Sequence, residues 1–134
     1  DSPVWNETGV ACLSLDALLS QSDVVSLHIP LTPATRNLIG AGQMSTMRPG
    51  AVIINSARGG VIDEIALAAA LREKRLGGAA LDVFDAEPLK AGSPLAGCPN
   101  LILTPHIAGV TAESNVRVSD MIAERVAQFL LQAA

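Results

Sequence analysis

The chain has 134 residues, of which 49% are hydrophobic and only 2% aromatic, so it can bury a core of mainly aliphatic side chains. A chain of this length corresponds to one domain at most. The net charge of −4, together with the lack of an extended Lys/Arg cluster, argues against nucleic acid or an anionic membrane surface as the main partner.

The cellular compartment is predicted from the cysteines and the hydropathy. Cys12 and Cys98 do not have the spacing of metal ligands, so we expect no metal site, and two free thiols suit a reducing compartment. The sequence has no apolar run long enough to span a bilayer and no signal-peptide core at its start. We therefore expect a cytoplasmic protein with no membrane partner.

Four short apolar runs alternate with segments of helical character, which is the pattern of a parallel α/β sheet. The expected strands are residues 23–27, 51–55, 78–82 and 101–103. The expected helices are residues 14–19, 41–47, 63–74 and 111–131, with Asp63 and Thr111 as N-caps of the last two. Residues 85–100, which are rich in proline, are expected to form a long loop. The run 52–54 is expected to be buried on both faces of the sheet.

Polar and charged residues follow the expected strands. In open α/β sheets, ligands bind outside the carboxyl ends of the strands. A cation, two carboxylates and an imidazole are placed at or near those ends, and together they are typical of a catalytic site rather than of packing. These residues are Arg58, Asp82, Glu87 and His106.

Arg58 lies between a strand end and Gly59-Gly60. An arginine at such a place is often a plain surface residue. Beside two glycines, however, a guanidinium can approach a small acid closely and hold its carboxylate with two parallel hydrogen bonds. The pattern alone leaves both interpretations open.

The remaining strand-end residues also have two interpretations each. Glu87 could be a solvated loop charge and His106 a structural histidine, but a carboxylate paired with an imidazole raises its pKa, fixes its tautomer and makes a general acid/base. Asp82 ends an apolar strand, where an unpaired charge is costly unless it faces a cleft or a partner. His28, which precedes Ile29-Pro30, could simply satisfy a turn.

Three longer motifs occur in order along the chain. Residues 54–64 read INSARGGVIDE, residues 78–84 read GAALDVF and are followed by Glu87-Pro88, and residues 103–109 read LTPHIAG. These motifs closely resemble the NAD-dependent D-isomer-specific 2-hydroxyacid dehydrogenases, the family that includes phosphoglycerate dehydrogenase. The resemblance implies a Rossmann-type, doubly wound parallel sheet. Residues 1–110 would be the second part of the NAD-binding domain, and residues 111–134 a long C-terminal helix that returns toward a substrate domain.

The resemblance also implies an oxidoreductase that transfers a hydride between NAD(H) and a small D-2-hydroxy acid or 2-keto acid. Arg58 would bind the substrate carboxylate and polarise the carbonyl, His106 would exchange a proton with the substrate oxygen, and Glu87 would support the protonated histidine. Asp82 would hold the nicotinamide carboxamide. The residues implied in cofactor binding are Asp1, His28, Ile29, Pro30, Ser56, Ala57, Arg58, Asp82, His106, Ala108 and Gly109. A homodimer is also implied.

The glycine-rich dinucleotide fingerprint Gly-x-Gly-x-x-Gly is missing. By the resemblance, Asp1 corresponds to the acidic residue that binds the adenosine ribose hydroxyls, which favours NAD over NADP. In the strand order 3-2-1-4-5-6, residues 24–27 would be strand three and residues 52–55 strand four, with two absent strands between them. We therefore expect a fragment of a longer chain, with strands that cannot pair directly, and an isolated segment that aggregates and binds NAD negligibly.

Two other functions stay open at this point. Corepressor-like relatives use the same scaffold to sense NAD, and they keep the arginine, glutamate and histidine. The absence of the fingerprint also allows a catalytically inactive fragment. The sequence does not name the substrate, because selectivity in this family lies mainly in the substrate domain.

Overall fold

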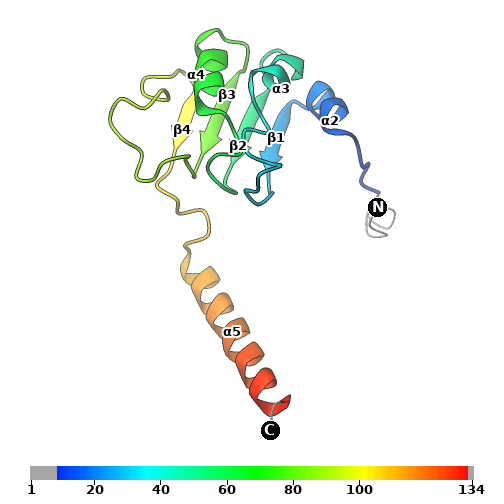
Figure 1. Cartoon of the computed structure of the whole chain (residues 1–134), viewed down its shortest axis with the longest axis vertical. Coiled ribbons are helices and arrows are strands. Elements are labelled where there is room, and N and C mark those ends of the chain that lie inside the picture. The colour runs from blue at the N-terminus through cyan, green and yellow to red at the C-terminus, as the bar shows by residue number, and fades with distance from the viewer. Residues whose placement is uncertain (1–8, 133–134) are drawn as a thin grey trace.

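The computed structural model describes residues 9–132, which form a parallel α/β unit and a separate long helix (Figure 1). The sheet has four strands in the order β1-β2-β3-β4. The strands are β1 (Val24–Leu27), β2 (Val52–Asn55), β3 (Gly78–Leu81) and β4 (Leu101–Leu103). The helices are α2 (Leu15–Gln21), α3 (Ala41–Thr46), α4 (Glu64–Arg72) and α5 (Ala112–Gln132). The fold class and the alternation of elements predicted from the sequence are confirmed.

Side-chain caps fix where the helices begin. Ser14 Oγ accepts a hydrogen bond from the Ala17 amide at 3.3 Å, and Asp63 Oδ1 accepts from two amides of the first turn of α4 at 3.0 Å each. Thr111 Oγ1 accepts from the Ser114 amide at 3.0 Å. Each of these bonds satisfies an amide that has no partner within its helix. The predicted caps at Asp63 and Thr111 are therefore present.

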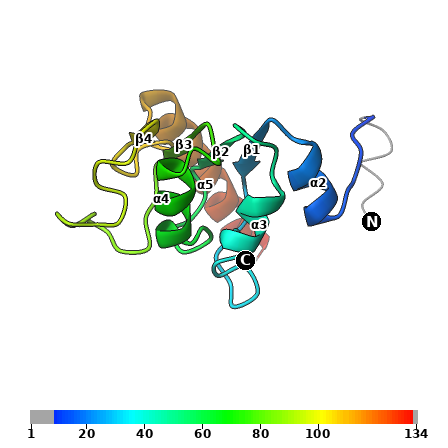
Figure 2. The same cartoon turned by 90° about the horizontal axis from the view of Figure 1, so that it is seen from above.

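The core lies on one face of the sheet. Helices α3 and α4 run along that face (Figure 2), and it carries the buried strand residues Val25, Leu27, Ile53, Asn55, Ala79 and Leu81. The alternate residues point to the other face, where Val24 is 56% exposed and Ile102 is 66% exposed. Val52 and Ile54 are only half-buried. The expectation that this run is buried on both faces is therefore wrong for the described residues.

The predicted separation of the first two strands is also wrong. Strand β1 pairs directly with β2 in parallel, with Val24 opposite Val52 and Leu27 opposite Asn55. The error came from counting residues 24–27 as the third strand of the domain, on the far side of two others. Direct pairing makes β1 and β2 neighbours, while the aggregation of the isolated segment and its negligible binding of NAD stay predictions.

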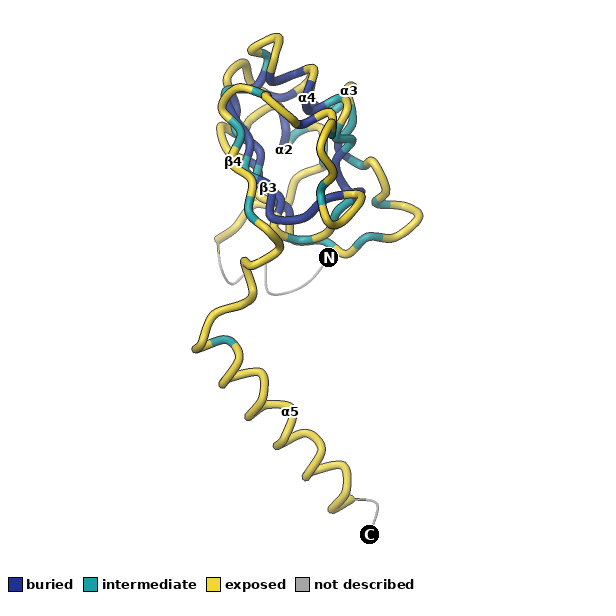
Figure 3. The backbone as a smooth tube through the Cα atoms, turned by 90° about the vertical axis from the view of Figure 1, so that its left-hand side faces the viewer, coloured by how far each residue is buried: buried dark blue, intermediate teal, exposed yellow. Residues whose placement is uncertain are grey.

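Helix α5 extends away from the α/β unit (Figure 1), and its residues are exposed or half-buried along the described length (Figure 3). The predicted apolar stripe is present and exposed, with Val118, Ile122, Val126 and Phe129 between 47% and 70% accessible. No helix within residues 9–132 is both long and apolar enough to cross a membrane. The division of the chain at residues 110 and 111 stays a prediction.

Candidate active site

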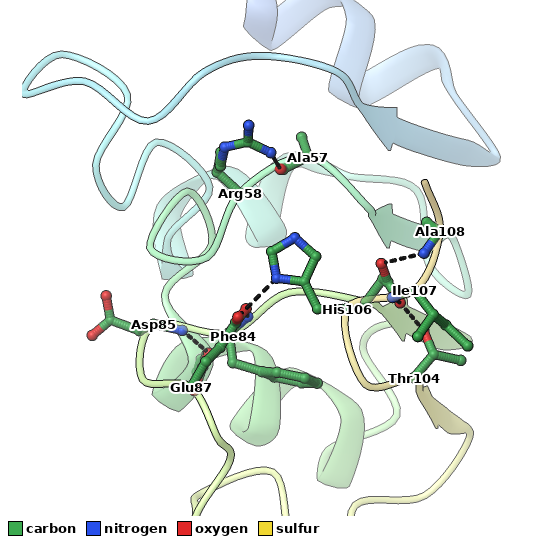
Figure 4. Close-up of polar contacts among 11 residues, drawn as sticks. Ala57, Arg58, Phe84, Asp85, Glu87, Thr104, His106, Ile107 and Ala108 are labelled. Atoms are coloured by element: carbon green, nitrogen blue, oxygen red, sulfur yellow. Dashed lines mark hydrogen bonds and ion pairs between the residues drawn. The ribbon is translucent and has the colours of Figure 1, made fainter. Parts of the chain in front are cut away.

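The parallel topology brings the predicted catalytic residues to one edge of the sheet. All four strands run in the same direction, so the segments that follow β2, β3 and β4 leave the sheet at the same edge. The first of these segments carries Arg58, the second Asp82 and Glu87, and the third His106. Figure 4 shows Arg58, Glu87 and His106.

The side chains of His106 and Glu87 form a hydrogen-bonded pair. The Nδ1–H of His106 donates to Glu87 Oε2 at 2.7 Å, as predicted. The other carboxylate oxygen, Oε1, accepts from the Phe84 amide at 3.0 Å, so both oxygens of Glu87 are held in place. The hydrogen bond from His106, followed by that from the Phe84 amide, holds the pKa of Glu87 below its ordinary value. Glu87 is therefore a carboxylate at neutral pH, and the second ring nitrogen of His106, Nε2, points away from it, toward the side on which Arg58 lies (Figure 4).

Asp82 supports the segment that carries His106. Its side chain is buried, at 6% exposure. Oδ1 accepts from Thr104 Oγ1 at 2.5 Å and from the Ile107 amide at 2.9 Å, and Oδ2 accepts from the Ala108 amide at 2.8 Å. Burial by itself would raise the pKa of Asp82, but these three hydrogen bonds and the nearby His106 lower it below its ordinary value. Asp82 is thus a charged acceptor, and its three donors all come from the segment that follows β4.

A buried asparagine shapes the turn that carries Arg58. Asn55, at 2% exposure, accepts from the Ala57 amide at 3.1 Å and donates through Nδ2 to the Arg58 carbonyl at 3.0 Å. The Arg58 guanidinium itself is exposed, and its Nη1 donates to the Ala57 carbonyl at 2.6 Å. In this conformation the guanidinium is folded back on its own loop and forms no hydrogen bond with Glu87 or His106.

The three predicted catalytic residues border two different hollows at the same edge of the sheet. Glu87 and His106 border a hollow of about 680 Å³ together with Phe84, Pro88, Leu89, Leu103, Thr104 and Pro105. Arg58 borders a second hollow of about 320 Å³. The physical reason is the side-chain conformation of Arg58, which points its charge at the Ala57 carbonyl instead of across the strand ends.

The Arg58 loop and the Glu87 loop are packed backbone to backbone. A Cβ atom added at Gly59 would lie only 1.7 Å from the Phe84 carbonyl oxygen. The next glycine, Gly60, has a left-handed φ of +77°, and its neighbours include the ion pair between Arg36 and Asp85 at 3.1 Å. These contacts fix the distance between the two sides of the site.

The second hollow collects most of the predicted cofactor residues. It is lined by His28, Ile29, Pro30, Ser56, Ala57 and Arg58, at the carboxyl ends of β1 and β2. The ring of His28 is oriented by Ser26, whose Oγ lies 2.8 Å from Nε2. The hollow has apolar walls with a few polar groups, and its size is near the lower end of those that hold small ligands.

The other predicted cofactor residues lie elsewhere. The segment after β3 carries Asp82, and the segment after β4 carries His106, Ala108 and Gly109. The Ala108 amide already donates a hydrogen bond to Asp82. Asp1 lies outside the described residues.

Sequence reasoning missed how Asn55 and Thr104 shape the site, and for Gly59 it missed the close approach of Phe84. A polar residue that ends a buried strand is a signal that could have found Asn55. Gly59 and Thr104 occur in the motifs quoted above, but their contacts with Phe84 and Asp82 join segments far apart in the sequence. No local pattern predicts those contacts.

Residues 2–108 match the family described as "D-isomer specific 2-hydroxyacid dehydrogenase, NAD binding domain". The chain is 52% identical to the (S)-sulfolactate dehydrogenase of Chromohalobacter salexigens over 97% of its own length and 42% of that relative. It is 44% identical to the D-3-phosphoglycerate dehydrogenase of Escherichia coli K12 over 95% of its length and 32% of that relative. The chain thus spans less than half of the curated relatives it matches.

Solved structures of 2-hydroxyacid and 2-keto acid oxidoreductases are also similar to this chain. A glyoxylate reductase from Paecilomyes thermophila superposes with a TM-score of 0.84 at 36% identity, covering 95% of this chain and 38% of that one. The D-lactate dehydrogenase of Aquifex aeolicus, solved with NAD and lactic acid, gives a TM-score of 0.82 at 34% identity over 98% and 44% of the two chains. This chain therefore belongs to the D-isomer-specific 2-hydroxyacid dehydrogenase family, in which it matches the NAD-binding domain.

Proposed function

We propose that the full-length protein is an NAD-dependent oxidoreductase that interconverts a small D-2-hydroxy acid and its 2-keto acid. The observation that carries this proposal is the 2.7 Å bond between His106 and Glu87 at the strand ends, in a chain of this family. A fixed imidazole–carboxylate pair is a general acid/base, which reduction of a keto group requires.

His106 exchanges the proton through Nε2, because Nδ1 is already bonded to Glu87. In the direction of keto-acid reduction, the imidazolium donates its Nε2 proton to the substrate oxygen and becomes neutral. In the direction of alcohol oxidation, the neutral ring accepts the hydroxyl proton at the same atom. The Glu87 carboxylate stabilises the imidazolium and keeps the Nδ1–H tautomer.

Arg58 binds the substrate carboxylate. Its guanidinium leaves the Ala57 carbonyl and forms two parallel hydrogen bonds with the acid, which places the adjacent keto group near His106. The guanidinium charge also stabilises the negative charge that develops on the substrate oxygen. Because the side chain is exposed, this rotation needs no rearrangement of the core.

We propose that NAD(H) lies along the strand ends, where it supplies or accepts the hydride. His28, Ile29, Pro30, Ser56 and Ala57 would form the wall of its site, in the hollow they share with Arg58. Asp82 would hold the carboxamide, and His106, Ala108 and Gly109 would line the opposite side. Asp1 would bind the adenosine ribose hydroxyls, which favours NAD over NADP.

For the whole protein, we propose a cytoplasmic homodimer in which residues 1–110 are part of the dinucleotide-binding domain and residues 111–134 are a helix that returns toward a substrate domain. The exposed apolar stripe of α5 supports a role in packing against further protein surface. The free thiols of Cys12 and Cys98 suit a reducing compartment. Light scattering on the full-length protein would measure the oligomeric state.

The test is turnover of a panel of 2-keto acids, including hydroxypyruvate, glyoxylate and pyruvate, by the full-length protein with NADH. We expect NADH oxidation with at least one of them and a faster reaction with NADH than with NADPH. NADH binding without any turnover would instead favour an NAD-sensing protein. Neither binding nor turnover would indicate an inactive chain.

A further inference from the structure

The segment that carries His106 has an uncommon backbone conformation. His106 has a φ of 57°, in the left-handed region that non-glycine residues rarely occupy. The next two amides, those of Ile107 and Ala108, donate to the two oxygens of Asp82 at 2.9 and 2.8 Å. One buried carboxylate therefore holds the backbone on the C-terminal side of the histidine.

Thr104 holds that carboxylate in turn. Its hydroxyl donates to Asp82 Oδ1 at 2.5 Å, the shortest of the three bonds to Asp82. The Thr104 amide donates to the Leu81 carbonyl at 3.0 Å, so the hydroxyl extends from a backbone that is anchored to β3. The Thr104 carbonyl also accepts from the His106 amide at 3.1 Å.

We propose that Thr104 is a positioning residue, whose hydroxyl orients Asp82 so that the Ile107 and Ala108 amides fix His106 in reach of both Glu87 and the substrate. This inference rests on the proposed function, because it assigns Thr104 a role in proton transfer by His106. Thr104 touches neither the Glu87 carboxylate nor the His106 ring by a hydrogen bond, so it acts through Asp82.

The effect of removing the Thr104 hydroxyl on kcat follows from the loss of one of the three hydrogen-bond donors to Asp82. Removing the hydroxyl leaves Oδ1 with only the Ile107 amide and lets the buried carboxylate rotate. The two amides then lose a fixed acceptor, and the His106 ring moves relative to Glu87. Because misplacing a reacting group by about 1 Å can cost about 10²-fold in rate, a partial displacement should reduce kcat by about tenfold.

The experiment compares Thr104→Val, Thr104→Ala and Thr104→Ser in the full-length protein. Val keeps the shape but lacks the hydroxyl, Ala covers the case in which Val lowers the soluble yield, and Ser restores the donor. Thr46→Val is the matched control, because Thr46 is exposed at the end of α3 and its hydroxyl only donates to Gln43 in its own helix. The readouts are kcat and KM with NADH and the best keto acid, and hydrogen exchange of the Ile107 and Ala108 amides.

We expect Val and Ala at position 104 to lower kcat by about tenfold, with the KM for the keto acid changed less than about twofold, and to speed exchange of both amides. We expect Ser to restore both kcat and the slow exchange. Unchanged kcat or unchanged amide exchange in both variants, or failure of Ser to restore them, would overturn the inference. The exchange measurement needs no substrate. If the wild-type protein turns over no keto acid, the proposed function and the role of Thr104 in proton transfer both fail. Slow amide exchange that depends on the hydroxyl would still show that the hydrogen bond between Thr104 and Asp82 exists.

Discussion

Gly59 is the position where one added methyl group should disturb the site most. It lies in the turn after Arg58, with the Phe84 backbone of the Glu87 loop directly against it. We predict that Gly59→Ala separates the two loops, and with them the substrate-binding arginine from the histidine–glutamate pair. Because Phe84 belongs to the hydrophobic core, we expect a loss of stability together with the loss of catalysis.

The magnitude follows from the distance. The new Cβ would lie 1.7 Å from the Phe84 oxygen, whereas real Cβ contacts are not shorter than 3.0 Å, so the loops must move apart by roughly 1.3 Å. A displacement of about 1 Å between reacting groups costs about 10²-fold in rate, which corresponds to about 2.7 kcal/mol. Overpacking should lower the free energy of unfolding by about 1–3 kcal/mol as well.

The assay measures kcat/KM for NADH-dependent reduction of the best keto acid, together with thermal unfolding. Gly42→Ala is the matched control, because Gly42 is an exposed position of α3 where a Cβ meets nothing within 4 Å. That substitution should leave kcat/KM unchanged and stabilise the helix by about 0.5–1 kcal/mol. A folded Gly59→Ala protein with the kcat/KM of the wild type would refute the packing of the two loops.

Three further predictions concern single side chains in the full-length protein. Arg58→Lys keeps the charge but loses the pair of parallel hydrogen bonds to the substrate carboxylate. Steady-state kinetics should therefore show a raised KM for the keto acid and a lower kcat, with a loss of about 2–4 kcal/mol in transition-state stabilisation. Wild-type kinetics would make Arg58 a plain surface residue. Glu87→Gln removes the anion that stabilises the imidazolium, so the pH–rate profile should lose more reduction activity at high pH than at low pH, and an unchanged profile would exclude this role. The lowered pKa of Asp82 means that its charged form stabilises the fold above its ordinary pKa of 3.8 and that this contribution is lost as the pH falls through the lower native value. Asp82→Asn should therefore lower Tm at neutral pH, by an amount that shrinks below pH 3.8, whereas an equal loss of Tm at every pH would contradict the charge argument.

Local chemistry explains why much of the structure could be predicted. Strand ends, helix periodicity and caps such as Asp63 depend on residues that are close together in the sequence. The parallel direction of the strands then brings Glu87 and His106 to one edge of the sheet. The hydrogen bond between Glu87 and His106 could be predicted from that placement, because a carboxylate accepts from an imidazole N–H.

The features that the sequence did not predict depend on information that a local pattern does not contain. The direct pairing of β1 with β2 depends on strand order, which periodicity does not specify. The fold-back of Arg58 onto Ala57 is a side-chain conformation on an exposed loop. The contacts of Gly59 with Phe84 and of Thr104 with Asp82 arise only when distant segments meet in the folded chain.

The most direct test of the account is the effect of His106→Asn on reduction of a 2-keto acid by the full-length protein with NADH. Asn keeps a polar group of similar reach but cannot transfer a proton near neutral pH, and general acid/base catalysis contributes about 10²–10⁴-fold. We predict a loss of kcat in that range, much larger than any change in NADH affinity measured by fluorescence titration. Wild-type turnover in the His106→Asn protein would contradict the central claim that His106, held by Glu87, transfers the proton.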